Sequence, residues 1–203
     1  GAACVLASHF GRPKKEIDPK YSLNVVVGRL SELLGRPVRL LPDCVGPRIV
    51  DACRGLKAGE VVLLENLRFH PEEEANDANF ARDLSMTADC YVNDAFGASH
   101  RAHASIVGVP RHLPSAAGLL VAAEVEHLGA LIGEPDRPFT AILGGAKVSD
   151  KIEILETLVS HVDSVLIGGA MAYTFLAAEK IEVGASRVEK DMIPTAERIL
   201  ALA

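Results

Sequence analysis

The strongest constraint on how this chain can fold is the regular alternation of short apolar runs with longer amphipathic segments. Runs such as residues 2–7 and 61–64 are apolar throughout, as expected of strands that are covered on both faces. Segments such as residues 23–34 instead repeat apolar side chains at helical spacing, and Gly35 is placed to end that helix. Strands that alternate with helices favour parallel, doubly wound sheets. The sequence therefore predicts an α/β fold of the Rossmann-like type.

This alternation continues along the whole chain and indicates two doubly wound parallel-sheet domains. Residues 118–133 are interpreted as a helix that joins a domain at residues 1–117 to a second domain at residues 134–203. The expected strands are residues 2–7, 38–41, 61–64, 90–92, 139–143 and 164–167. The expected helices are residues 23–34, 47–54, 73–84, 118–132, 151–162, 171–179 and 194–202.

Composition narrows the class of protein. A formal net charge of −6 argues against a protein that binds nucleic acid through a broad basic surface. No apolar run approaches the roughly 18 residues that span a membrane, and the N-terminus lacks the pattern of a signal peptide. The four cysteines show no CxxC spacing and are interpreted as reduced thiols in a cytoplasmic protein. Cys4 and Cys90 lie in strand-like runs, where a cysteine is usually buried.

Residues 139–155 (FTAILGGAKVSDKIEIL) predict a strand, a glycine turn and a helix. Gly144 and Gly145 lack a Cβ, so backbone N–H groups can approach an anion there, and the helix start adds its positive dipole end. Lys147 and Lys151 are four residues apart and would share one face of a helix. The spacing matches neither a P-loop nor GxGxxG. A phosphate site and an ordinary glycine-rich turn with solvated lysines are therefore equally supported.

The loops that follow strands are informative, because open parallel α/β sheets bind ligands at the carboxyl ends of their strands. Three of these loops combine arginine with histidine: His9 and Arg12; Arg68 and His70; and His100, Arg101 and His103. If the loops converge at one edge, their guanidinium and imidazole groups suit a phosphate or carboxylate ligand. The alternative is that each arginine is solvated or paired with a nearby glutamate such as Glu65 or Glu72.

Other polar groups receive structural interpretations. His100 and His103 have no third ligand at the spacing of a zinc site. The carboxylates of residues 72–74 are interpreted as a solvated helix start that the helix dipole favours, and Asp94 as a turn or cap residue. One half of the chain thus has the character of an oxyanion site and the other that of a polyphosphate site. This combination suits phosphoryl transfer between an anionic small molecule and a nucleotide.

Six segments then show a resemblance to a known family, and they occur in that family's order along the chain. The segments SHFGRP (8–13), DCVGP (43–47), LLENLRFH (63–70), NDAFGASHRAH (93–103), AILGGAKVSDKI (141–152) and IGGAMAYTF (167–175) resemble phosphoglycerate kinase. The resemblance implies reversible phosphoryl transfer between 1,3-bisphosphoglycerate and ADP, which gives 3-phosphoglycerate and ATP. It also implies Mg²⁺ with the nucleotide and a hinge at residues 118–133.

The resemblance assigns roles residue by residue. The implied ligands of the phosphoglycerate are His9, Phe10, Gly11, Arg12, Arg68, His100, Arg101 and His103. The implied ligands of the nucleotide are Gly144, Gly145, Ala146, Lys147, Lys151, Gly168 and Gly169. Lys147 is implied to be the catalytic group that stabilises charge on the transferring phosphoryl group, and Asp150 is implied to approach the magnesium ion.

The chain is short for the family. It begins at the family's second strand, so the first strand with its Asp-x-Asn motif has no counterpart, and neither does most of the C-terminal domain. Both domains are therefore expected to be incomplete, and the isolated chain to be inactive. The alternative function is a non-catalytic fragment whose exposed sheet edge pairs with another copy or a partner. A nicotinamide-dependent dehydrogenase is disfavoured because no GxGxxG follows a strand. The parent protein is expected to be a cytoplasmic monomer that binds neither nucleic acid nor membranes.

Overall fold

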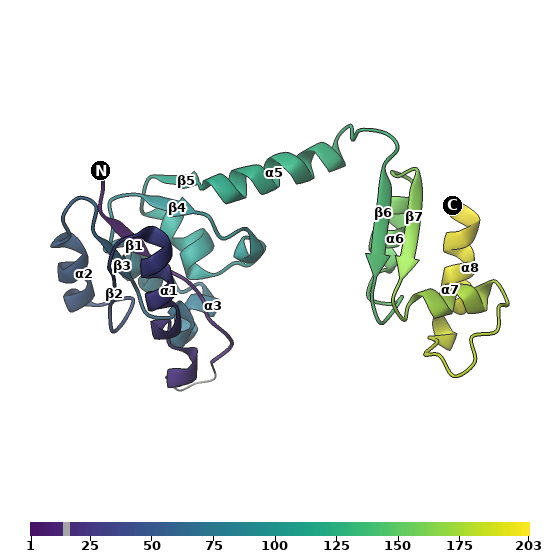
Figure 1. Ribbon diagram of the computed structural model, residues 1–203, viewed down its shortest axis with the longest axis horizontal. Helices are drawn as coiled ribbons and strands as arrows, with labels where there is room; N and C mark the ends of the chain where they lie inside the picture. Colours follow the sequence, from purple (N-terminus) through teal and green to yellow (C-terminus); the bar gives the residue numbers. More distant parts are fainter. Residues whose placement is uncertain (14–16) are drawn as a thin grey trace. The chain divides into compact units, whose positions relative to one another are not determined.

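The computed structural model describes residues 1–13 and 17–203 (Figure 1). The chain divides into two compact units, Gly1–His127 and Leu128–Ala203. The division falls inside helix α5 (Leu119–Ile132), which lies in the segment interpreted as a connection between domains. Each unit has its own parallel strands and its own hydrophobic core. The α/β fold with parallel strands is thus confirmed.

Three strands of the first unit form a parallel sheet in the order β1-β3-β2. Strand β1 is Cys4–Leu6, β2 is Val38–Leu40 and β3 is Val61–Leu63. Because β1 and β2 both pair in parallel with β3, their carboxyl ends lie at the same edge of the sheet. The loops that follow β1 and β3 therefore leave the sheet side by side.

Two further strands of the first unit form a separate parallel pair, β4 (Tyr91–Asn93) and β5 (Ser115–Ala117). Strand β5 was not predicted, since its sequence SAA contains no β-branched or aromatic residue. Among the described residues the first unit therefore has two sheets, where the sequence predicts one. Asp94, directly after β4, accepts hydrogen bonds from the backbone N–H groups of Leu120 (2.8 Å) and Val121 (3.1 Å). This contact confirms Asp94 as a cap residue, here of α5.

The helices of the first unit begin and end at recognisable signals. Helix α1 (Asn24–Leu34) ends at Gly35, which adopts the left-handed conformation with φ of 61°. Helix α2 (Pro47–Arg54) begins at a proline, as predicted. Alternate residues of β3 point into the cores on the two sides of the sheet: Leu63 packs on the side of α1, and Val62 on the side of α2. This double coverage is the arrangement that the continuous apolar strands predict.

The predicted acidic helix at residues 73–84 is two helices, α3 (Pro71–Ala75) and α4 (Ala78–Ser85). The break lies at Asn76, whose φ of 53° ends α3. Asp77 then starts α4, because its side chain accepts hydrogen bonds from the backbone N–H groups of residues 79 and 80. Short helical turns too brief to show a period are Pro19–Tyr21, Leu67–Phe69, Phe96–Ala98, Ala104–Gly108, Val109–Arg111 and Lys190–Met192.

The second unit contains one parallel pair of strands, β6 (Thr140–Gly144) and β7 (Ser164–Gly168). Three helices complete it: α6 (Ile152–Val159), α7 (Ala172–Ala178) and α8 (Ile193–Leu202). Their apolar faces pack with one face of the strand pair around the buried residues Val148, Leu155, Met171, Phe175, Ala178, Ala196 and Ile199.

The opposite face of the β6-β7 pair is open. Ile142 and Leu166 lie opposite each other on this face and are 78% and 55% exposed.

In the described part of the chain, no helix is both long and apolar enough to cross a membrane. All four cysteines are free, and the expectation that Cys4 and Cys90 are buried is wrong, because both are exposed. Cys4 starts an edge strand, and Cys90 precedes β4.

Candidate functional site

The loop after β1 is held in place by the buried side chain of Asn66. Its Oδ1 accepts hydrogen bonds from the backbone N–H groups of Phe10 (3.1 Å) and Arg68 (3.1 Å). Its Nδ2 donates to the carbonyl oxygens of Phe10 (2.7 Å) and Tyr21 (3.0 Å). Gly11 follows with φ of 60°, and a Cβ there would overlap the ring of Tyr21. Sequence reasoning missed Asn66, although a buried amide with both donors and acceptors suits this task.

Arg68 is bound to the same loop. Its Nη1 donates a hydrogen bond to the carbonyl oxygen of Gly11 at 2.8 Å, and Arg12 is the next residue of that loop. The Nε of Arg68 lies 3.0 Å from Glu74 Oε1, in an ion pair that is not aligned as a hydrogen bond. The glutamate that pairs with Arg68 is therefore Glu74, and not Glu65 or Glu72. The guanidinium is thus fixed beside the loop that carries Arg12.

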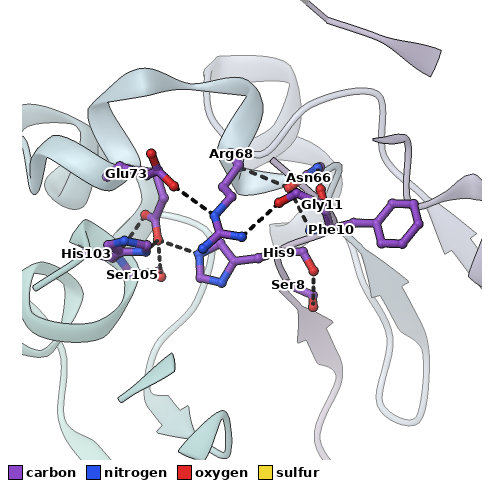
Figure 2. Close-up of polar contacts among 10 residues, drawn as sticks. Ser8, His9, Phe10, Gly11, Asn66, Arg68, Glu73, His103 and Ser105 are labelled. Atoms are coloured by element: carbon purple, nitrogen blue, oxygen red, sulfur yellow. Dashed lines mark hydrogen bonds and ion pairs between the residues drawn. The ribbon is translucent and has the colours of Figure 1, made fainter. Parts of the chain in front are cut away.

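The carboxylate of Glu73 joins three segments of the first unit (Figure 2). His9 Nε2 lies 2.7 Å from Glu73 Oε1, and Ser105 Oγ donates to the same oxygen at 2.5 Å. The backbone N–H of Ser105 donates to Oε2 at 3.0 Å. His103 Nδ1 lies 3.6 Å from Oε1. Glu73 is 0% exposed, so the interpretation of residues 72–74 as a solvated helix start is wrong for its central residue.

Opposing effects set the pKa values in this cluster. Burial raises the pKa of Glu73, but the hydrogen bonds from His9 and Ser105 outweigh it and hold the pKa below its usual value. Burial lowers the pKa of His103. The electrostatic interaction with Glu73 raises this pKa and the one with His9 lowers it, and the pKa lies below its usual value overall. Glu73 is therefore an anion at neutral pH, and His103 is a neutral imidazole.

The predicted substrate residues fall into two groups. Contacts join His9 to His103 through Glu73, and they join Phe10 and Gly11 to Arg68 through Asn66 and a direct hydrogen bond. Arg12, His100 and Arg101 lie on the same segments, but their side chains make no hydrogen bond or ion pair with this group among the described residues. Their roles stay predictions.

His70 does not join the group. Its Nε2 lies 2.7 Å from Asp43 Oδ1, and its ring packs on that of Phe80. The second basic side chain expected from the loop after β3 therefore has a structural partner.

Within residues 1–13 and 17–203, two clusters have donor types that can bind a metal ion: His9, Glu73 and His103, and Asp43, Cys44 and His70. In each cluster an imidazole nitrogen and a carboxylate oxygen are 2.7 Å apart. Two ligands of a tetrahedral zinc ion lie about 3.3 Å apart, given metal–ligand bonds of about 2.0–2.1 Å. Burial and the neighbouring Asp43 carboxylate also raise the pKa of Cys44, which keeps the thiol protonated. Both clusters are therefore hydrogen-bonded networks.

The two glycine turns of the second unit pack backbone against backbone. Gly144 ends β6 and lies opposite Gly168, which ends β7. Gly169 has φ of 71°, and a Cβ there would lie 2.8 Å from the carbonyl oxygen of Gly145. The same oxygen accepts a hydrogen bond from the N–H of Met171 at 3.0 Å. Glycine is therefore required at position 169, both by conformation and by space.

The lysines beside these turns do not share a helix face. Helix α6 begins at Ile152, so Lys147 and Lys151 both precede it, and the geometry argument for the pair is wrong. The segment before α6 is instead held by Glu189, whose carboxylate accepts hydrogen bonds from the N–H groups of Val148 and Ser149 (3.3 Å) and from Ser149 Oγ (2.8 Å). Burial raises the pKa of Glu189, but these hydrogen bonds outweigh it and lower the pKa. Two N–H groups that follow the glycine turn are therefore already bound.

Asp150 lies beyond this clamp on an open part of the surface. Together with Ser149, Ile152 and Glu153 it lines an open hollow of about 400 Å³. Two carboxylates and a hydroxyl group are oxygen donors of the type that Mg²⁺ accepts, with water and phosphate oxygens as further ligands.

Comparison with known proteins identifies the family. A family model described as phosphoglycerate kinase matches residues 1–203, the whole chain. The chain belongs to this family. It is 54% identical over 203 residues to a phosphoglycerate kinase of Moorella thermoacetica, and 53% identical over 203 residues to one of Desulforudis audaxviator. Both alignments cover 100% of the chain and 52% of the relative. The chain thus spans about half the length of the curated phosphoglycerate kinases it matches.

Solved structures of phosphoglycerate kinases agree. The enzyme of Coxiella burnetii matches with a TM-score of 0.82 at 34% identity, over 98% of this chain and 50% of the solved one. The enzyme of Pyrococcus horikoshii matches with a TM-score of 0.83 at 34% identity, over 97% and 52%. The family expected from the six sequence segments is therefore confirmed.

Proposed function

We propose that the polypeptide carrying this chain is an active phosphoglycerate kinase. It would transfer a phosphoryl group reversibly between 1,3-bisphosphoglycerate and ADP, giving 3-phosphoglycerate and ATP. The observation that carries the proposal is a set of contacts, those of His9 and His103 with Glu73 and of Arg68 with Gly11, which bring three loops of the first unit together in a chain of this family. The paired glycine turns of the second unit support the nucleotide half of the reaction.

The first unit would bind the phosphoglycerate. Arg12, Arg68 and Arg101 would bind its phosphate and carboxylate oxygens, since a guanidinium pairs with two oxygens of such a group at once. The other ligands would be His9, Phe10, Gly11, His100 and His103. The hydrogen bond of Arg68 to Gly11 supports this role, because it holds one guanidinium close to the loop of Arg12 before any ligand binds.

The second unit would bind the nucleotide. Its phosphates would lie at the glycine turn, against the chain at Gly144, Gly145 and Ala146 and against the side chains of Lys147 and Lys151. Gly168 and Gly169 would line the adenosine side. Because Glu189 already binds the N–H groups of Val148 and Ser149, the phosphates would contact the part of the turn before Val148.

Mg²⁺ would enter with ADP or ATP. The oxygen donors around Asp150 fit this ion, and Asp150 would be its protein ligand, with nucleotide phosphate oxygens as the others. When bound, the ion neutralises phosphate charge. The residues of this chain then have two tasks, which are to position the ligands and to stabilise charge on the transferring group. Lys147, exposed beside the glycine turn, would stabilise that charge in the transition state.

The substrate half of the proposal is tested by titrating the polypeptide that carries this chain with 3-phosphoglycerate. Replacing Arg68 or Arg101 with alanine should weaken binding at least tenfold, since each charge-assisted hydrogen bond contributes about 1.5–3 kcal/mol. Arg29→Ala is the matched control, because Arg29 is exposed on α1 and pairs only with Glu32 among the described residues. Unchanged affinity in both the Arg68 and the Arg101 variants would reject the assignment.

The catalytic half is tested with Lys147→Ala. A residue that acts on the transition state should lower kcat strongly and change the affinity for substrates little. Lys180→Ala serves as control, since Lys180 is an exposed lysine at the end of α7. A normal kcat in the Lys147 variant would remove this residue from the catalytic role.

The proposal extends to the setting of the protein. As an enzyme of glycolysis it would act in the cytoplasm, as a monomer, on small molecules. The net charge of −6 supports the expectation that it binds no nucleic acid. The isolated chain would not turn over, because it spans about half of the length over which its relatives carry this activity.

A further inference from the structure

Glu73 is buried where its surroundings in the sequence offer no reason for burial. It is the central residue of three consecutive glutamates in α3, and its neighbours Glu72 and Glu74 are exposed. A helix dipole favours an acidic residue at this position without removing it from water. Burying a carboxylate is costly unless hydrogen bonds replace its hydration. Its partners must therefore account for its position.

Those partners come from two segments that are distant in the sequence. His9 belongs to the loop after β1, and Ser105 belongs to the short helix Ala104–Gly108. Ser105 provides two of the three hydrogen bonds, from its backbone N–H and from its hydroxyl group. Helix α3 thus acts as the common support of two loops that carry proposed phosphoglycerate ligands.

The contact also fixes the protonation of the His9 ring. An ionised carboxylate can only accept hydrogen bonds, so His9 Nε2, at 2.7 Å, must carry a proton. In the neutral ring, Nδ1 is then an acceptor, which can take a hydrogen bond from a hydroxyl group of a ligand. The ring of His9 meets that of His103 edge to face, with centroids 5.4 Å apart. His103 Nδ1, buried and without a hydrogen bond, faces the same carboxylate. The orientation of both rings therefore depends on Glu73.

We propose that Glu73 is a positioning residue of the phosphoglycerate site, which holds His9 and the His103–Ser105 segment at a fixed separation against α3. Glu73 does not touch the substrate. It presents His9 Nδ1 and keeps the loop of Arg12 next to the loop of Arg101. This inference rests on the proposed function, because it takes these loops as the binding site of 3-phosphoglycerate.

The experiment compares Glu73→Gln with Glu72→Gln in the polypeptide that carries this chain. Calorimetric titration should show at least tenfold weaker binding of 3-phosphoglycerate for Glu73→Gln, and a change of less than twofold for Glu72→Gln. Binding of ADP should change less than twofold in both. A ¹⁵N spectrum of the histidines, recorded where their rings are neutral, should show a single Nε2-protonated form for His9 in the parent protein and a mixture of the two tautomers in Glu73→Gln.

A purely structural role for Glu73 predicts a different result, namely a loss of thermal stability with an unchanged tautomer of His9 and unchanged affinity. That result would overturn the inference. If Glu73→Gln does not fold, Ser105→Ala provides the test, because it removes one hydrogen bond to Glu73 and keeps the carboxylate. Its affinity for 3-phosphoglycerate should fall about threefold. Unchanged affinity would overturn the inference. Failure of the parent protein to bind 3-phosphoglycerate would instead overturn the proposed function, while the tautomer of His9 still reports on Glu73.

Discussion

Replacing Asn66 with alanine tests whether one side chain holds the loop after β1. The substitution removes four hydrogen bonds, which satisfy the N–H and C=O of Phe10, the N–H of Arg68 and the C=O of Tyr21. At a net contribution of about 1 kcal/mol each, the sum is about 4 kcal/mol. Phe10 and Tyr21 are partly exposed, so water can replace some of these partners, and we expect a loss of about 3 kcal/mol in the free energy of unfolding of the first unit.

Hydrogen exchange of backbone amides measures this loss in the first unit alone. The N–H of Leu64 is a suitable probe, because it donates to the carbonyl oxygen of Leu6 at 2.8 Å and links β3 to β1. A loss of about 3 kcal/mol predicts exchange roughly 100-fold faster at this amide. Asn79→Ala is the control, since Asn79 is exposed on α4, and exchange should stay within about threefold. An increase below about fivefold for Asn66→Ala would refute the view that the loop depends on Asn66.

Three further predictions concern the glycine turns, their clamp and the buried acid. Gly169→Ala should weaken ADP binding at least tenfold. Gly184→Ala is the control, because Gly184 also has a positive φ but has open space around it, and its affinity for ADP should stay within twofold. Equal effects of the two substitutions would exclude the backbone contact of Gly169 as the cause. Glu189→Gln should weaken ADP binding about three- to tenfold relative to the exposed control Glu182→Gln, because the clamp on the loop loses its charge. The folded-state pKa of Glu73 lies below its usual 4.5, so its contribution to stability is present above that pH and is lost as the pH falls through the folded value. Thermal melts between pH 3 and 6 should therefore show a steeper acid loss for the parent protein than for Glu73→Gln, and parallel curves would contradict this sign.

The elements that the sequence predicts well carry their signals locally. Helix α1 has a continuous helical period and a terminal Gly35, and α2 begins at Pro47, so neither depends on distant contacts. The break at Asn76 was missed because the apolar period of residues 73–84 runs on across it. Strand β5 was missed for the opposite reason, since Ser115–Ala117 has no period of its own and becomes a strand only by pairing with β4.

The sequence predicts which residues form the site, but not which side chains hold those residues in place. Arginine and histidine after parallel strands indicate an anion site, because strand topology brings these loops to one edge. Nothing in a run of three glutamates distinguishes Glu73 from its neighbours. Successive residues of a helix point about 100° apart, so only one of three can face a given partner. Which one faces inward depends on where His9 and Ser105 lie, and those positions follow from the packing of segments 32 and 64 residues away.

The carboxylates that hold the site residues in place affect the free energy of anion binding. Arginine side chains repel one another when their loops are brought together, and a free loop must also lose entropy when a ligand orders it. Here the carboxylates of Glu73 and Glu74 hold His9 and Arg68 in place before an anion arrives. These two carboxylates, one buried and one exposed, therefore hold the loops in the folded protein, so that the ligand does not have to gather them. The affinity of the first unit for an anion should thus depend on two acidic residues as strongly as on its basic ones.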